Sequence, residues 1–193
     1  MQRNSLPDIP LRILLTGAAG QLGKQLCPRL RQQGYFVRAL LRHSRPDLPP
    51  ADELVIEELN RQSDFASLLA DIDILIHLAD GFNAFEHLPA TAIKNEASSR
   101  AQTTKALASA AAKANVRLIY LSTIKTMCGT HADEILTEKT APRPQSLYGR
   151  LKLDAEQNIL AAAKQYGSRN RKVVANCLRA QMEKIRIGRN PQA

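Results

Sequence analysis

The sequence has no tryptophan, and its four tyrosines and four phenylalanines make it poor in aromatic residues. Sites for single-stranded nucleic acid stack bases on aromatic side chains, so this scarcity argues against such a site. The chain also lacks an apolar run long enough to cross a bilayer, and its first ten residues lack the apolar region of a signal peptide. We therefore expect a cytoplasmic protein without a membrane or nucleic-acid partner.

Cysteine is scarce as well. Cys27, Cys128 and Cys177 are odd in number and widely spaced, which is typical of reduced thiols and not of a disulfide framework. Cys128 and His131 form a CxxH pair, but no second pair completes a tetrahedral ligand set. We expect no metal site.

Acidic residues are outnumbered, with 18 Asp and Glu against 27 Lys and Arg, and the formal net charge is +9. Residues 168–193 hold seven of the basic residues and one acidic residue, which leaves only +3 for the other 167 residues. This distribution predicts one nearly neutral domain over residues 1–178 and a solvated basic tail over residues 179–193, not a nucleic-acid surface.

Short apolar runs alternate with longer segments that have a helical pattern. The runs predict buried strands at residues 11–15, 35–41, 54–56, 71–78, 116–122 and 172–178. The intervening patterns predict helices from the glycines of 17–23 to Gly34, and at residues 63–70, 97–114 and 148–166. The remaining long segment, 126–147, has no apolar period and predicts a functional loop. The repeated order of strand, helix and strand indicates an α/β fold, a Rossmann-like doubly wound parallel sheet with helices on both faces.

Three glycines, Gly17, Gly20 and Gly23, lie between the first predicted strand and the first predicted helix. In a GxxGxxG turn of this kind, one glycine makes the sharp turn, another lets the backbone approach a pyrophosphate, and the third lets the helix pack on the strand. The helix N-terminus offers unpaired N–H groups to the phosphates. The motif therefore predicts a site for NAD or NADP.

The end of the second strand usually reads the adenosine ribose, where an acidic residue binds the 2′-OH and an arginine accepts a 2′-phosphate. Here that position is Arg42, 19 residues after Gly23, and His43 and Arg45 follow it. Because no acidic residue lies in this stretch, charge complementarity favours NADP over NAD.

Tyr148 and Lys152 are four positions apart at the start of a predicted helix, so they share one face. An ammonium beside a phenol favours the phenolate and makes the tyrosine usable as a base. YxxxK alone is a common chance pattern. Its position adds weight, because Ser122 and Thr123 end the fifth strand at the edge where ligands of such sheets bind, and a hydroxyl there would hold a substrate oxygen near Tyr148.

With these residues in place, the chain resembles the extended short-chain dehydrogenases/reductases, specifically the NAD-dependent epimerase/dehydratase group that includes UDP-glucose 4-epimerase-like proteins. The matching segments are TGAAGQLG at 16–23, DILIHLA at 73–79, LASAAAKANVRLIYLSTIK at 107–125 and YGRLKLDAEQ at 148–157. The resemblance implies that Thr123, Tyr148 and Lys152 are catalytic and that Lys152 also bonds the nicotinamide ribose. The cofactor-binding residues that we expect are Gly17, Ala19, Gly20, Gln21, Leu22, Gly23, Arg42, Leu59, Leu78, Ala79, Tyr148 and Lys152.

The chain departs from that family at three places. Arg100 stands four residues before Thr104, where such proteins usually have an asparagine that supports the active site, although Asn95 is nearby. The stretch TMCG after Lys125 is one residue longer than the family pattern. Beyond the sixth predicted strand the family continues with a substrate-binding part, which we expect to be absent here, with the basic tail in its place.

Two functions follow as hypotheses. The first is an NAD(P)-dependent epimerase/dehydratase or reductase that acts on a nucleotide sugar by hydride transfer assisted by the Tyr148 and Lys152 pair. The second is a truncated module that binds a dinucleotide with weak or no turnover. The resemblance also allows a homodimer.

Overall fold

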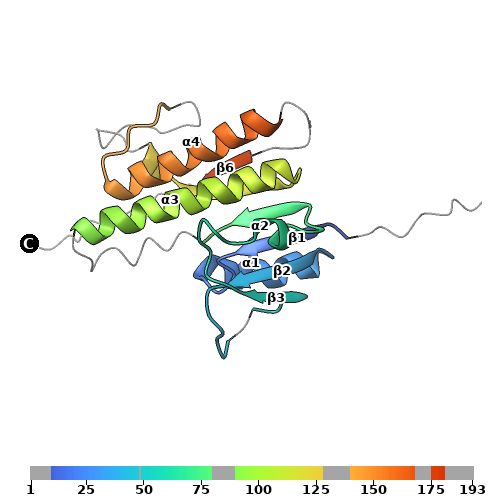
Figure 1. Ribbon diagram of the computed structural model, residues 1–193. Coiled ribbons are helices and arrows are strands. Elements are labelled where there is room, and N and C mark those ends of the chain that lie inside the picture. Colours follow the sequence, from blue (N-terminus) through green and yellow to red (C-terminus); the bar gives the residue numbers. More distant parts are fainter. Residues whose placement is uncertain (1–9, 48, 80–89, 128–139, 168–174, 181–193) are drawn as a thin grey trace, which may run out of the picture.

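The computed structural model describes residues 10–47, 49–79, 90–127, 140–167 and 175–180. Within them, six strands form one sheet in the order β3-β2-β1-β4-β5-β6, and every neighbouring pair is parallel. The strands are β1 (Arg12–Thr16), β2 (Phe36–Leu41), β3 (Glu53–Ile56), β4 (Ile74–His77), β5 (Arg117–Thr123) and β6 (Ala175–Ala180). The helices are α1 (Gln21–Gln32), α2 (Phe65–Leu68), α3 (Ala90–Lys113), α4 (Leu147–Gly167) and the 3-10 helix η2 (Ile124–Thr126), as Figure 1 shows.

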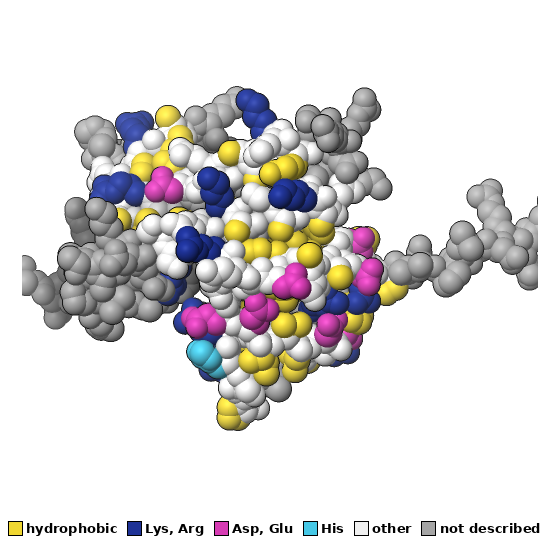
Figure 2. Space-filling view, viewed as in Figure 1, with side chains coloured by type: hydrophobic (Ala, Val, Ile, Leu, Met, Phe, Trp, Pro, Cys, Tyr) yellow, Lys and Arg dark blue, Asp and Glu magenta, His cyan; other side chains and the backbone are white. Residues whose placement is uncertain are grey.

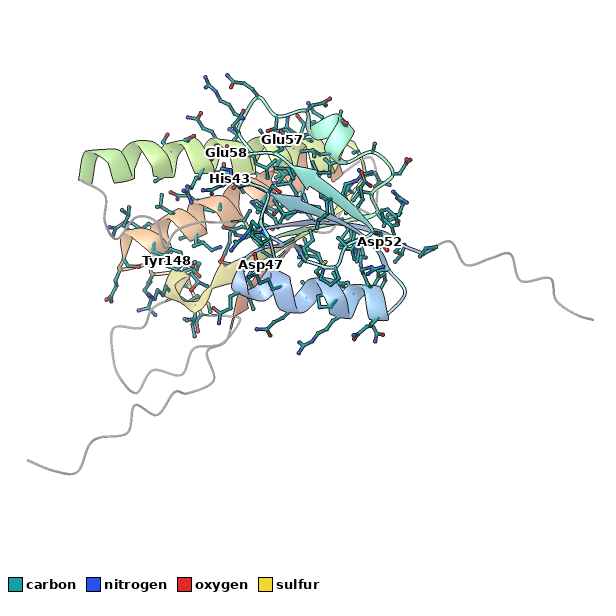
Figure 3. The ribbon with its side chains drawn as sticks, turned by 90° about the horizontal axis from the view of Figure 1, so that it is seen from below. His43, Asp47, Asp52, Glu57, Glu58 and Tyr148 are labelled. Atoms are coloured by element: carbon teal, nitrogen blue, oxygen red, sulfur yellow. The ribbon has the colours of Figure 1, made fainter. Side chains whose placement is uncertain are left out.

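Apolar side chains on both faces of the central strands bury the sheet. Along β1, Ile13 and Leu15 belong to one core cluster with Cys27 of α1, whereas Leu14 belongs to a second cluster with Leu107 of α3. Side chains that alternate along a strand point to opposite faces, so α1 covers one face of the sheet and α3 covers the other. Figure 3 shows α1 on the opposite side of the sheet from α3 and α4. The predicted doubly wound sheet with helices on both faces is therefore confirmed.

Several elements differ from the sequence prediction at their ends: β4 and α2 are shorter than predicted, and α3 and β6 are shifted. The helix predicted from residue 97 begins at Ala90, because the apolar pattern records where the helix is buried and not where it starts: Ala97 is 4% exposed and Leu107 is 1% exposed. The sixth strand was predicted at 172–178 but spans Ala175–Ala180, where its register on β5 pairs Ala180 with Thr123. Its pairing with β5, and not its apolar run, sets where it ends.

Charged side chains divide unevenly between the two halves of the molecule. On the face in Figure 2, Lys and Arg are spread mainly over α3 and α4, while most Asp and Glu gather over the half that contains α2 and β3. The described part of the chain has no helix that is both long and apolar enough to span a membrane.

The turn after β1 brings two strand ends into backbone contact. Gly17 has φ +72°, and a Cβ atom built on it would lie 2.8 Å from the Ala79 nitrogen just beyond β4. Only glycine combines this left-handed conformation with such a close approach. Gly34 has a similar φ of +83° but no atom within 4 Å of a built Cβ.

The two glycines provide a matched test of that approach. Gly34→Ala is expected to lower the free energy of unfolding by about 1 kcal/mol, the conformational cost alone. Gly17→Ala adds steric overlap with Ala79 and should lower it by about 2–5 kcal/mol. Urea unfolding followed by circular dichroism measures both, and equal losses would show that the approach of Gly17 to Ala79 is not a packing constraint.

Candidate functional site

A pocket of about 490 Å³ opens at the carboxyl ends of the strands, where the direction of winding reverses between β1 and β4. Open α/β sheets bind ligands at this position. The β1–α1 turn, the ends of β2 and β4, the segment after β3, and α3 form the walls. The lining residues are Gly17, Ala19, Gly20, Leu40, Leu41, Arg42, Arg45, Glu57, Glu58, Leu59, Asn60, His77, Leu78, Ala79, Ser99, Arg100, Thr103 and Thr104.

The three glycines of the turn differ in what the fold requires of them. Gly23 packs against the turn, because a Cβ there would lie 2.5 Å from the Ala18 Cα. Gly20 has an ordinary extended conformation, with φ −73° and ψ 171°, and a Cβ there would meet only the Gly17 carbonyl oxygen, at 3.1 Å. Protein contacts therefore account for Gly17 and Gly23, while Gly20 leaves room beside the pocket.

The N-terminus of α1 is suited to an anion. Gly20 is its N-cap residue and provides no side-chain cap, and the first turn contains no acidic residue. The first N–H groups of a helix have no partner within the helix. Together with the helix dipole they favour a phosphate at this end.

Two strand ends on the pocket wall are held together by a side-chain hydrogen bond. Thr16 Oγ1, at the end of β1, lies 2.7 Å from His77 Nδ1, at the end of β4. Thr16 Oγ1 also accepts a hydrogen bond from the Ala79 N–H at 3.4 Å. Thr16 is fully buried and His77 is 3% exposed, so the strand ends behind the glycine turn are held in place.

Acidic side chains lie beside Arg42. The sequence analysis predicted Arg42 at this position but not its acidic neighbours. β2 and β3 pair with Leu41 opposite Ile56, so the residues after Ile56 come next to Arg42. Arg42 Nε is 3.6 Å from Glu58 Oε1. Glu57 and Glu58 follow the third strand, and only the pairing of β2 with β3 shows that they belong to this edge; Figure 3 labels both there, near His43.

A second group of charges follows Arg42. Arg45 pairs with Asp47 at 3.3 Å, and Lys24 of α1 pairs with the same carboxylate. The hydrogen bond from Lys24 is the main cause that lowers the pKa of Asp47. Asp47 is therefore ionised at neutral pH and links the segment after β2 to α1.

The predicted catalytic residues lie on neighbouring elements. Thr123 is the last residue of β5, and Tyr148 and Lys152 lie in the first two turns of α4. Gly149 lets α4 approach η2, since a Cβ there would overlap the Lys125 carbonyl oxygen. The sheet edge, η2 and the start of α4 thus form one unit.

Lys152 is a buried cation, with 2% of its surface exposed. Its Nζ donates to the Leu121 carbonyl oxygen of β5 at 2.5 Å and lies 4.2 Å from the centre of the Tyr120 ring. Burial of a cation is costly unless polar partners or a negative charge face it.

The pocket includes seven of the residues expected to bind the cofactor: Gly17, Ala19, Gly20, Arg42, Leu59, Leu78 and Ala79. Gln21, Leu22 and Gly23 lie in the first turn of α1, and Leu22 is 53% exposed. Tyr148 and Lys152 are not among the described residues that line the pocket. Arg100, singled out as a family departure, lines it from α3. The Asn95 side chain lies outside the described residues.

The sequence analysis considered one pair of residues as metal ligands and expected no metal site, and that pair is not described by the structure. Cys128 and His131 lie outside the described residues. Among the described ones, no group of three His, Cys, Asp or Glu side chains is arranged to hold a metal ion. Cys27 is a free thiol whose pKa is raised mainly by burial, and its Sγ donates to the Pro50 carbonyl oxygen at 3.2 Å.

The strand order and the glycine turn at the winding reversal define a Rossmann-type α/β protein. Residues 13–177 match the model of the NAD-dependent epimerase/dehydratase family, and the chain belongs to that family. No curated protein sequence matches the chain at a significant level.

Solved structures of similar fold include several proteins that act on UDP sugars. MoeE5 in complex with UDP-glucuronic acid and NAD is 30% identical, with a TM-score of 0.69, over 87% of this chain and 54% of that one. UDP-glucuronic acid 4-epimerase from Bacillus cereus, in complex with UDP-glucuronic acid and NAD, is 23% identical, with a TM-score of 0.72, over 88% and 56%. UDP-N-acetylglucosamine 4-epimerase from Bacillus cereus is 24% identical, with a TM-score of 0.67, over 88% and 53%. The chain thus spans about half the length of each.

Gly20 is the position that separates binding from folding. Gly20→Val should leave the chain folded, because the backbone there suits a branched residue, but should weaken dinucleotide binding about 10- to 100-fold through steric overlap with the pyrophosphate. Gly20→Ala should give a smaller loss. Titration of NADH and NADPH fluorescence measures the affinities, with circular dichroism to confirm folding. Unchanged affinity in folded Gly20→Val would mean that the turn does not hold phosphate.

Proposed function

We propose that this chain is the dinucleotide-binding half of an NAD(P)-dependent epimerase/dehydratase or reductase that acts on a nucleotide sugar. The observation that carries the proposal is the pocket at the winding reversal, formed by the glycine turn and the N-terminus of α1. The family membership and the 30% identity with MoeE5, whose structure holds UDP-glucuronic acid and NAD, support it.

The residues present fit a dinucleotide. Gly20 leaves space for a pyrophosphate at the α1 N-terminus, and Ala79 and Leu78 form an apolar wall beyond β4. Arg42 and Glu58 lie at the end of the pocket where an adenosine ribose would sit. Arg42 would pair with a 2′-phosphate, while Glu58 would accept a hydrogen bond from a 2′-OH. Both cofactors are therefore compatible with the site.

In this mechanism the side chains of the protein accept, hold and return a proton. A bound nicotinamide supplies the hydride acceptor. Tyr148, as the phenolate, removes the proton from a sugar hydroxyl, and Thr123 orients that hydroxyl from the end of β5. Lys152 favours the phenolate through its buried positive charge. An epimerase would return the hydride to the other face of the keto sugar, whereas a reductase cycle would release or take up the keto compound.

A second function, dinucleotide binding without turnover, is favoured by one observation. The described residues that line the pocket all lie between positions 17 and 104, whereas the chain spans about half the length of the solved relatives. Cofactor binding and catalysis are thus separable, and a substrate site need not be present for the pocket to form.

Replacement of Tyr148 distinguishes these two functions. Tyr148→Phe keeps the ring and removes the titrating oxygen, so dinucleotide affinity should persist while hydride exchange with keto sugar nucleotides falls about 10²- to 10⁴-fold. Lys152→Met should reduce both the rate and the affinity. The assay follows NADPH and NADH absorbance with a panel of sugar nucleotides. Binding without any exchange in the native chain would favour the binding module, and turnover that survives in Tyr148→Phe would exclude Tyr148 as the base.

The ion pair at the ribose end predicts how cofactor preference can be changed. Glu58→Gln releases Arg42 and removes a negative charge that repels a 2′-phosphate, so the affinity ratio of NADPH to NADH should rise about two- to fivefold, as expected for an exposed ion pair. Arg42→Gln should lower that ratio by at least as much. Fluorescence titrations of the two variants and the native chain give the ratios. A ratio that moves in neither variant would show that this edge does not read the ribose.

A further inference from the structure

A lysine other than Lys152 lies beside the predicted base. Lys125 lies in η2, between the end of β5 and the segment that leads to α4, and its Nζ is 5.6 Å from the centre of the Tyr148 ring. The printed sequence pattern suggests Lys152 as the cation for Tyr148, but the described contacts of Lys152 Nζ are to β5, at the Leu121 carbonyl and the Tyr120 ring. The ammonium of Lys125 lies over the Tyr148 ring.

Local hydrogen bonds set the position of Lys125. Thr123 caps η2 by accepting a hydrogen bond from the Lys125 N–H at 3.3 Å, and Thr126 Oγ1 donates to the Thr123 carbonyl at 2.9 Å. The Lys125 carbonyl in turn packs against Gly149, the residue after Tyr148. The backbone of Lys125 is therefore held against the first turn of α4, and only its side chain has freedom to move.

We propose that Lys125 is a positioning residue that stabilises the phenolate of Tyr148 together with Lys152. A cation over an aromatic face is attracted to the ring, and the attraction grows when the ring carries a negative charge. Lys152 would act from the buried side of α4 and Lys125 from the exposed side. This inference rests on the proposed role of Tyr148 as the base.

The charged residues close to Tyr148 along the chain are mostly basic. On η2, on the described segment before α4 and on the first turns of α4 they are Lys125, Arg143, Arg150, Lys152 and Asp154. Asp154 is exposed and six positions further along α4, which is not a facing position on a helix. The Glu156 carboxylate is buried and accepts a hydrogen bond from Ser122. The cation shown to lie over the Tyr148 ring is that of Lys125.

The absence of tryptophan and the presence of only four tyrosines make the phenolate directly measurable. Near-ultraviolet absorbance of tyrosinate is titrated with pH in the native chain and in Tyr148→Phe, and the difference isolates Tyr148. We expect a pKa below the ordinary value of about 10. Lys125→Met should raise that pKa by about half a unit or more, Lys125→Arg should restore it, and added salt should reduce the effect, because Lys125 is exposed.

The fold contains a matched control. Lys113 Nζ lies 5.3 Å from the centre of the Tyr166 ring, which is a similar pair at the other end of α3 and α4. Lys113→Met should leave the pKa of Tyr148 unchanged. Circular dichroism confirms that each variant is folded, and Lys125→Gln serves as the second neutral variant if Lys125→Met is not.

The outcomes separate this inference from the proposed function. A Tyr148 pKa that rises in Lys152→Met but not in either neutral Lys125 variant overturns the role of Lys125 and leaves Tyr148 as the base. A pKa near 10 in the native chain, unchanged in every lysine variant, overturns both. A rise in the Lys125 variants with restoration by arginine supports the proposal, since loss of structure alone would not be rescued by charge.

Discussion

The turn between β1 and α1 must pass close to the end of β4, and the geometry of the candidate site depends on this approach. Gly17 in its left-handed conformation lies against the backbone of Ala79, and Gly23 lies against Ala18. A side chain at either position would push the turn away from the sheet. The approach directs the N-terminus of α1 into the space between the strand ends, and the bond between Thr16 and His77 keeps that space bounded. The pocket is therefore a consequence of close backbone packing at glycine residues, which have no side chain to prevent it.

A glycine also permits a close backbone contact at the other end of the carboxyl edge of the sheet. Gly149 lets the start of α4 contact η2, directly after β5. This contact places Tyr148 beside the segment that contains Thr123 and Lys125, while Lys152 reaches β5 one turn further along the helix. A hydroxyl, a phenol and two ammonium groups thus come from elements that are separated in sequence but joined by one close backbone contact. The backbone contact fixes where these groups start, and the long side chains of Lys125 and Lys152 reach from there to Tyr148 and to β5.

Charge around Arg42, at the end of β2, is balanced and not purely basic. Arg42 is exposed and paired with Glu58, and Arg45 is paired with Asp47. Exposed pairs of this kind contribute little to stability, but they decide which ligand charge is tolerated nearby. The net charge of +9 is therefore a poor guide to this pocket, because its local field is set by pairs between neighbouring segments.

Local patterns in the sequence were enough for the fold class, since apolar runs record burial on both faces of a strand and the spacing of Gly17, Gly20 and Gly23 records a turn between strand and helix. They also identified Arg42 as the charge after β2. They could not reveal that Glu58 stands beside it, because that neighbour is set by the register of β3 on β2. They also placed the start of α3 at residue 97, whereas the helix begins at Ala90. The position of Lys125 over Tyr148 likewise depends on how α4 packs on η2. The sequence by itself determined the order of elements and their buried faces, which are properties of short segments. Only the tertiary structure decided which charges meet, because such contacts depend on strand register and on backbone approach between distant segments.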